Sequence, residues 1–110
     1  TVSERPEQER LLARGKTSDY LGMTVQEITP EIARHFGLRS VEGVIVTAVK
    51  KDGPAGKAGI EEQDIILQVN RTRIENLKEY NQVMAKSAER ESVLLLIKRG
   101  NAQYYVAIRK

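Results

Sequence analysis

The sequence contains no cysteine and no tryptophan, and it has one histidine, His35. The lack of cysteine excludes a disulfide framework and thiolate chemistry, although it does not identify the cellular compartment. A Ser–His–Asp triad would have to use His35, and no serine stands in the GxSxG arrangement of a nucleophile elbow. We interpret His35 as a surface residue and expect no catalytic residue in this chain.

Long apolar runs and clustered metal ligands are missing as well. No stretch approaches the roughly 20 apolar residues of a membrane-spanning helix, and no signal peptide is present. The acidic residues lack the spacing of a calcium loop, and the glycines form neither a GxGxxG nor a Walker motif. The net charge of +3 is mild and its signs are mixed, which does not favour nucleic acid. We therefore expect no metal, cofactor or nucleic-acid partner.

The 110 residues suffice for one domain with one hydrophobic core. Because the chain begins with Thr1 rather than Met, we expect a fragment or a processed product of a longer protein. Residues 1–19 are polar and highly charged, which predicts a linker that is helical in part. Residues 20–110 are expected to form the folded unit.

Short strand-like runs dominate the folded unit, and helix signals interrupt them at three places. Strands are expected at 23–27, 43–49, 64–70, 93–98 and 103–108, and helices between Thr29 and Gly37, at 54–59 and roughly at 77–88. This order predicts an α+β, mainly β fold. We expect a small, partly open barrel or sandwich of five to six strands, capped by two to three helices.

The expected helix at 77–88 presents two faces. Leu77, Asn81 and Met84 fall at positions i, i+4 and i+7 on one of them. The adjacent face carries Tyr80, Val83 and Ser87 and is better suited to the core. Leu77 and Met84 therefore have two interpretations: they line a groove, or they belong to the core as well.

Gly22 raises a separate question, because it stands between two bulky apolar residues where a polar segment leads into the strand at 23–27. Glycine in a strand lowers stability, since it loses the most backbone entropy and offers no side chain to pack. It usually marks a tight turn, a bulge or a close approach of another group to the backbone.

An ordered series of motifs resembles the PDZ domains, in an arrangement close to that of the HtrA/Deg-type serine proteases. Tyr20-Leu21-Gly22-Met23 resembles the carboxylate-binding loop of this family, and residues 29–38 resemble its TPELA…LGL segment. Residues 43–60 are similar to GVLV…GSPAxxAGL, and residues 63–70 (QDIILQVN) are similar to GDVILxVNG. The resemblance covers about residues 20–110, and the TPE(I/L)A…GL form is similar to that of a second, C-terminal PDZ copy.

Two positions depart from the family pattern. Gln63 and Arg71 stand where the family usually has glycine. The turns at these positions must therefore tolerate a side chain, and we expect an unusual backbone angle at Gln63 or Asn70.

The resemblance implies a peptide groove between the strand at 23–27 and the helix at 77–88. A peptide would add to an exposed edge of that strand as an antiparallel partner. The backbone amides of the loop Tyr20, Leu21, Gly22 and Met23 would bind its terminal carboxylate, and Gly22 would leave room for it. The implied groove residues are Thr24, Val25, Gln26, Leu77, Asn81 and Met84, and Lys16 either supports the carboxylate or is a solvated linker residue.

The resemblance also implies a function. The chain would be a noncatalytic module of a periplasmic or cell-envelope HtrA-type serine protease, which binds apolar C-terminal or unfolded segments and regulates the protease or delivers substrate to it. Its partners would be such polypeptides, an upstream protease domain and other protease subunits. Two alternatives remain open: an assembly module with an unused groove, and a PDZ domain of another protease, such as a tail-specific or an intramembrane one.

Overall fold

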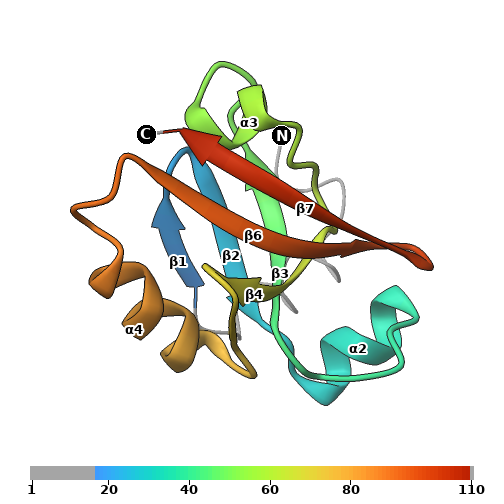
Figure 1. Ribbon diagram of the computed structural model, residues 1–110. Coiled ribbons are helices and arrows are strands. Elements are labelled where there is room, and N and C mark those ends of the chain that lie inside the picture. Colours follow the sequence, from blue (N-terminus) through green and yellow to red (C-terminus); the bar gives the residue numbers. More distant parts are fainter. Residues whose placement is uncertain (1–16, 110) are drawn as a thin grey trace.

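The computed structural model describes residues 17–109, which form one antiparallel sheet and three helices (Figure 1). The strands are β1 (Thr17–Tyr20), β2 (Met23–Glu27), β3 (Val44–Val49), β4 (Ile65–Val69), β5 (Thr72–Arg73), β6 (Ser92–Arg99) and β7 (Ala102–Arg109). The helices are α2 (Pro30–Phe36), α3 (Pro54–Ala58) and α4 (Leu77–Lys86). The mainly β fold with helices is confirmed.

The sheet has the strand order β1-β2-β3-β4-β6-β7, and β5 pairs with β4 beside this path. Seven strands replace the five to six that the sequence predicted. The two additional strands are short: β5 has two residues and β1 has four. Such segments are too short to show a period of two, so only their pairing partners define them.

The helix starts and two of the three helix ends agree with the capping residues in the sequence. Thr29 and Asn76 each accept a hydrogen bond from the backbone N–H three positions later, at 3.1 and 2.9 Å. Gly37 and Gly59 end α2 and α3 in the left-handed conformation, with φ of 70° and 100°. The third helix, α4, ends at Lys86, two residues before its predicted end.

Buried apolar side chains form two clusters. The larger cluster joins the sheet to α4, and the smaller one lies under α2. In β6 the buried residues alternate with half-buried ones, as expected for a strand with one face on the core. The larger cluster consists of Met23, Val25, Val44, Val46, Ala55, Ile60, Ile66, Val69, Ile74, Leu77, Tyr80, Met84, Val93, Leu95, Ile97 and Ile108.

The sheet begins earlier in the chain than expected. Residues 17–19 belong to β1 and pair with β2, so the structure places them in the sheet rather than in the linker. The predicted linker helix and Lys16 lie outside the described residues. In the described part of the chain, no helix is long and apolar enough to cross a membrane.

Candidate functional site

The segment Tyr20–Met23 forms the turn of a hairpin between β1 and β2. Tyr20 is paired with Met23, so the turn itself consists of Leu21 and Gly22. Both residues have positive φ, 58° at Leu21 and 78° at Gly22, which is the backbone of a type I′ hairpin turn. Leucine rarely adopts this conformation, because its side chain crowds the following carbonyl group.

The carbonyl groups of this turn are held by the segment at 50–55. The Leu21 oxygen accepts a hydrogen bond from the Ala55 N–H at 3.0 Å, and the Gly22 oxygen accepts one from the Lys50 N–H at 2.8 Å. The C=O and N–H of one trans peptide unit point in opposite directions. The N–H groups of Gly22 and Met23 are therefore directed away from the 50–55 segment.

A close contact within the chain gives one reason for glycine at position 22. A Cβ atom on Gly22 would lie 3.2 Å from the Cα of Gly53 and 3.5 Å from the Cδ of Pro54. The group that approaches Gly22 is thus the backbone of the same chain, and the positive φ adds a second requirement for glycine. That Gly22 also leaves room for a ligand stays a prediction.

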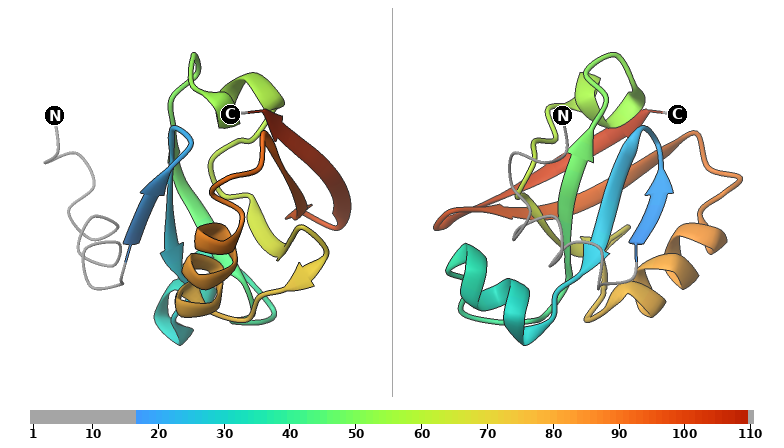
Figure 2. Two further views of the ribbon diagram at one scale, coloured as in Figure 1. Left: turned by 60° about the vertical axis from the view of Figure 1, so that its left-hand side comes forward. Right: turned by 180° about the vertical axis from the view of Figure 1, so that it is seen from behind.

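The expected exposed edge of β2 is not free either. On one side β2 pairs with β3, and on the other it pairs with β1, in the register Ser18↔Val25 and Asp19↔Thr24. Figures 1 and 2 show β1 on the side of β2 away from β3, at the end of the sheet near α4. Helix α4 contacts β1. The chain's own β1 therefore fills the space that the sequence assigned to a peptide.

Four of the six candidate groove residues are buried. Leu77 and Met84 are 4% and 5% exposed and belong to the larger core cluster, so the core interpretation applies to them. Val25 and Gln26 are also fully buried, whereas Thr24 is half-buried and Asn81 is exposed. The structure thus brings the predicted loop, strand and helix residues together, but as a closed interface rather than an open groove.

A hydrogen-bond network fixes the far end of α4 against the sheet. The Asn70 Nδ2 donates to the Ser87 Oγ at 2.6 Å, and the Leu94 N–H donates to the Asn70 Oδ1 at 3.0 Å. Asn70 has a φ of 51°, and Gln63 and Arg71 also have positive φ, as expected for turns that replace glycine with another residue. This network ties the C-terminal end of α4 to the end of β4 and to β6.

Asp64 is a second anchor, and the sequence pattern predicted only a strand at this position. It is 1% exposed and accepts two hydrogen bonds of 2.8 Å from Arg99, through Nε and Nη2. The Glu61 N–H donates to the same carboxylate at 2.9 Å. This hydrogen bonding raises the pKa of Arg99 above its usual value. The pair joins the start of β4 to the end of β6 and is structural.

Sequence reasoning missed β1 itself. Its residues Ser18 and Asp19 pair with β2, and the Thr24 Oγ1 donates to the Asp19 Oδ1 at 2.6 Å. One signal for the hairpin was present: Leu21-Gly22 separates two short runs, as a two-residue turn does. The first position of such a turn is usually Asn or Asp. Because Leu21 occupies it here, the sequence does not match the usual hairpin pattern.

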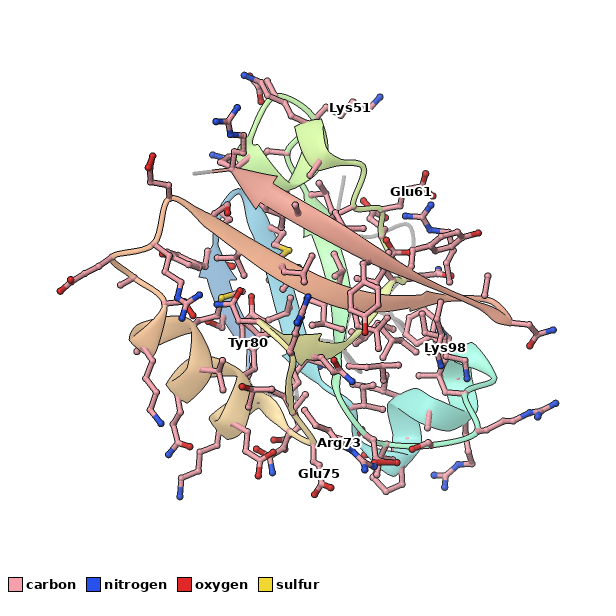
Figure 3. All side chains as sticks on the ribbon, viewed as in Figure 1. Lys51, Glu61, Arg73, Glu75, Tyr80 and Lys98 are labelled. Carbon is pink, nitrogen blue, oxygen red and sulfur yellow. The ribbon has the colours of Figure 1, made fainter. Side chains whose placement is uncertain are left out.

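Tyr80 of α4 lies between the helix and the sheet (Figure 3). It is 1% exposed, and its hydroxyl has no hydrogen-bond partner among the described residues. Burial raises the pKa of Tyr80, and the nearby Tyr20 of β1 raises it further. A buried hydroxyl without a hydrogen bond lowers the stability of the folded state. The packing of α4 around Tyr80 therefore carries an energetic cost.

A separate hollow of about 610 Å³ lies between α2 and the hairpin of β6 and β7. Its lining includes Phe36, Leu38, Leu67, Arg73 and Lys98, of which the last two are labelled in Figure 3. Arg73 forms an ion pair with Glu42. None of the predicted site residues lines this hollow, and the described residues contain no cluster of ligands that could hold a metal ion. His35 is exposed on α2, with its ring edge-on to Phe36.

Comparison with known proteins identifies the fold. A family model described as "PDZ domain" matches residues 45–99. The chain is 36% identical over 110 residues to a protein of Chlamydia trachomatis named probable periplasmic serine endoprotease DegP-like, covering 99% of this chain and 21% of that protein. The chain belongs to the PDZ domain family. A PDZ domain is a noncatalytic module, in agreement with the expectation that this chain contains no catalytic residue.

A second relative of the PDZ domain, the probable periplasmic serine endoprotease DegP-like of Rickettsia conorii, is 34% identical over 106 residues, 96% of this chain and 21% of that protein. The chain therefore spans about a fifth of the length of these curated relatives. Among solved structures, the HtrA3 PDZ domain bound to the phage-derived ligand FGRWV has 22% sequence identity and a TM-score of 0.69, with 86% of each chain covered. This likeness shows the fold.

Proposed function

We propose that this PDZ domain is the peptide-binding module of a periplasmic or cell-envelope serine endopeptidase of the HtrA type. The DegP-like proteases that share about a third of its residues support this assignment. In that setting the upstream partner is a protease domain, and the module regulates the protease or delivers polypeptides to it.

One observation carries the peptide-binding proposal: the Gly22 and Met23 N–H groups point away from the 50–55 segment, because that segment holds the carbonyl groups of Leu21 and Gly22. Oriented backbone amides suit a carboxylate, and the Met23 N–H becomes available to one when Tyr20 no longer pairs with Met23. The loop leads directly into β2, whose backbone can pair with an antiparallel peptide.

The ligand class follows from the side chains around this position. Leu21, Met23, Val25 and Met84 are apolar and lie in or against the larger cluster. They suit an apolar last residue of the peptide, and Leu77 at the start of α4 suits an apolar residue two places earlier. Asn81, which is exposed, and Thr24 lie at the rim of this region. The ligands are thus apolar C-termini or unfolded segments.

The expected affinity is modest. Hydrogen bonds to a charged carboxylate contribute roughly 1.5–3 kcal/mol each, and one buried aliphatic side chain adds roughly 1.5–3 kcal/mol. The lost freedom of the peptide offsets much of this gain. We expect a Kd on the order of micromolar, about −8 kcal/mol.

The test is a fluorescence-anisotropy titration with labelled FGRWV, which ends in an apolar residue, compared with its C-terminal amide. Tenfold tighter binding of the free acid, about 1.4 kcal/mol, supports carboxylate recognition by the loop. Equal binding of both peptides would reassign the ligand to internal extended segments. Absence of binding to this and other apolar C-termini would contradict the peptide-binding role.

A second candidate function, an assembly module, has one observation in its favour. Strand β7 is the last strand of the sheet, and its Tyr104 and Tyr105 are 47% and 62% exposed. Exposed aromatic residues on a terminal strand are typical of contact surfaces. Analytical ultracentrifugation over a range of concentrations tests this function, with Tyr105→Ser as the variant that weakens association.

A further inference from the structure

We propose that β1 is an intramolecular occupant of the peptide groove, and that an external peptide binds only after β1 detaches from β2. This inference rests on the proposed peptide-binding function and adds its regulation. The segment immediately before the loop, β1, occupies the peptide position beside β2 and so controls access to the groove.

The direction of β1 is the first argument. It is antiparallel to β2, and its C-terminal residue Tyr20 lies at the turn that precedes Met23. A peptide whose carboxylate binds the amides of Gly22 and Met23 would run in the same direction along the same edge of β2. The two strands would need the same backbone groups of β2, so they exclude each other.

The contacts of β1 are the second argument. Tyr20 and Leu21 pack against the larger core cluster, which includes Leu77 and Met84 of α4. Helix α4 contacts β1 directly. Tyr20 and the adjoining Leu21 therefore occupy apolar surface of the cluster that contains the candidate groove residues.

The weakness of the β1 contact is the third argument. β1 has four residues and, within residues 17–109, pairs with β2 alone, since it is the terminal strand there. Leu21 is held at a φ of 58°, a strained conformation that detachment would release. The hydroxyl of Tyr80 is buried beside Tyr20 without a hydrogen-bond partner among the described residues. These features lower the cost of opening, whereas β3 and β4 are held from both sides.

The fold offers a direct way to lock β1. Tyr20 and Met23 close the two-residue turn, so the next pair, Asp19 and Thr24, is a non-hydrogen-bonded pair whose Cα atoms lie about 4.5 Å apart. Their side chains meet, as the hydrogen bond between them shows. This spacing accepts a disulfide bond, and the chain has no other cysteine that could react.

The experiment compares the double variant Asp19→Cys/Thr24→Cys in oxidised and reduced form, using labelled FGRWV and a thiol titration to confirm the bond. We expect the oxidised form to bind at least 100-fold more weakly than the reduced form, and dithiothreitol to restore binding. Equal binding by the oxidised and reduced forms would overturn the inference while leaving peptide binding intact.

A second variant tests the opposite change. Ser18→Pro removes a backbone N–H from the middle of β1 and should detach the strand. If β1 is open in 1–10% of molecules, its release strengthens apparent binding by about 10- to 100-fold. Circular dichroism and a melting curve establish that the variant is folded.

The outcomes separate the two proposals. Stronger binding by folded Ser18→Pro supports the inference, even if the wild-type chain binds too weakly to measure. Unchanged binding by this variant overturns it. If the wild-type, reduced and Ser18→Pro proteins all fail to bind any apolar C-terminal peptide, the peptide-binding function itself fails.

Discussion

Gly22 and Gly53 pack so closely that a Cβ atom on Gly22 would lie 3.2 Å from the Cα of Gly53. The contact joins the β1–β2 turn to the residue before α3, next to the hydrogen bonds that orient the turn amides. The shape of the candidate carboxylate loop therefore depends on two glycines from separate segments.

We predict that Gly22→Ala destabilises the domain by about 1–3 kcal/mol, because the new Cβ meets Gly53 and the residue must keep a positive φ. Gly37→Ala is the matched control, since Gly37 has a φ of +70° but nothing within 4 Å of its Cβ position. Gly37→Ala should lower the free energy of unfolding only through the unfavourable backbone conformation, by about 1 kcal/mol. Urea unfolding measures both variants, and equal losses would show that the contact with Gly53 is unimportant.

Leu77→Ala should destabilise the domain by about 2–4 kcal/mol, because Leu77 is 4% exposed and its removal leaves a cavity in the larger cluster. Asn81→Ala, one turn further along α4 and exposed, should change stability by less than about 0.5 kcal/mol. Thermal and urea unfolding give both values. A negligible effect of Leu77→Ala would indicate that this side chain faces an open groove in solution.

Tyr80 should make stability fall in alkaline solution. Burial raises its pKa above the ordinary value of 10.0, so the folded state keeps a proton that the unfolded state loses above about pH 10. Its stabilising contribution is complete below that pH and decreases as the pH rises toward the folded-state pKa, by up to about 1.4 kcal/mol per pH unit.

Tyr80→Phe tests this dependence and the unpaired hydroxyl together. At pH 7 we expect the variant to be as stable as the wild type or more stable by about 1 kcal/mol, because it removes a buried hydroxyl without a partner among residues 17–109. Urea unfolding at pH 7 and pH 11 should show a smaller alkaline loss in the variant. A large loss at pH 7 would reveal a hydrogen bond to this hydroxyl.

Arg99→Ala should cost about 2–3 kcal/mol, because it leaves the Asp64 carboxylate buried and without its two hydrogen bonds from the guanidinium group. Arg99→Lys should recover only part of this loss, since an ammonium group cannot make the same paired contact. The exposed Arg109 gives the control Arg109→Ala, with an expected change below about 0.5 kcal/mol. Equal effects at the two arginines would contradict a structural role for the Asp64–Arg99 pair.

Most of the local structure follows from short stretches of the sequence. Thr29 and Asn76 cap their helices, Gly37 and Gly59 end theirs, and the strand at Met23–Glu27 has its predicted bounds. These features depend on residues that are only a few positions apart. Capping residues and the alternation of apolar residues can therefore be recognised within one short segment. The ordered series of motifs is equally local, and it indicates the PDZ family from the residues alone.

The neighbour of β2 on its outer side depends on contacts between distant segments, such as those of β1 with α4. Whether the outer edge of β2 is free depends on the position of Thr17–Tyr20. This segment is too short and too polar to show the alternating pattern of a strand. Whether Leu77 and Met84 line a groove or a core depends on the same segment, because β1 packs against the helix that carries them. Burial is a property of all the elements that meet at a place, so the pattern along one helix cannot determine it.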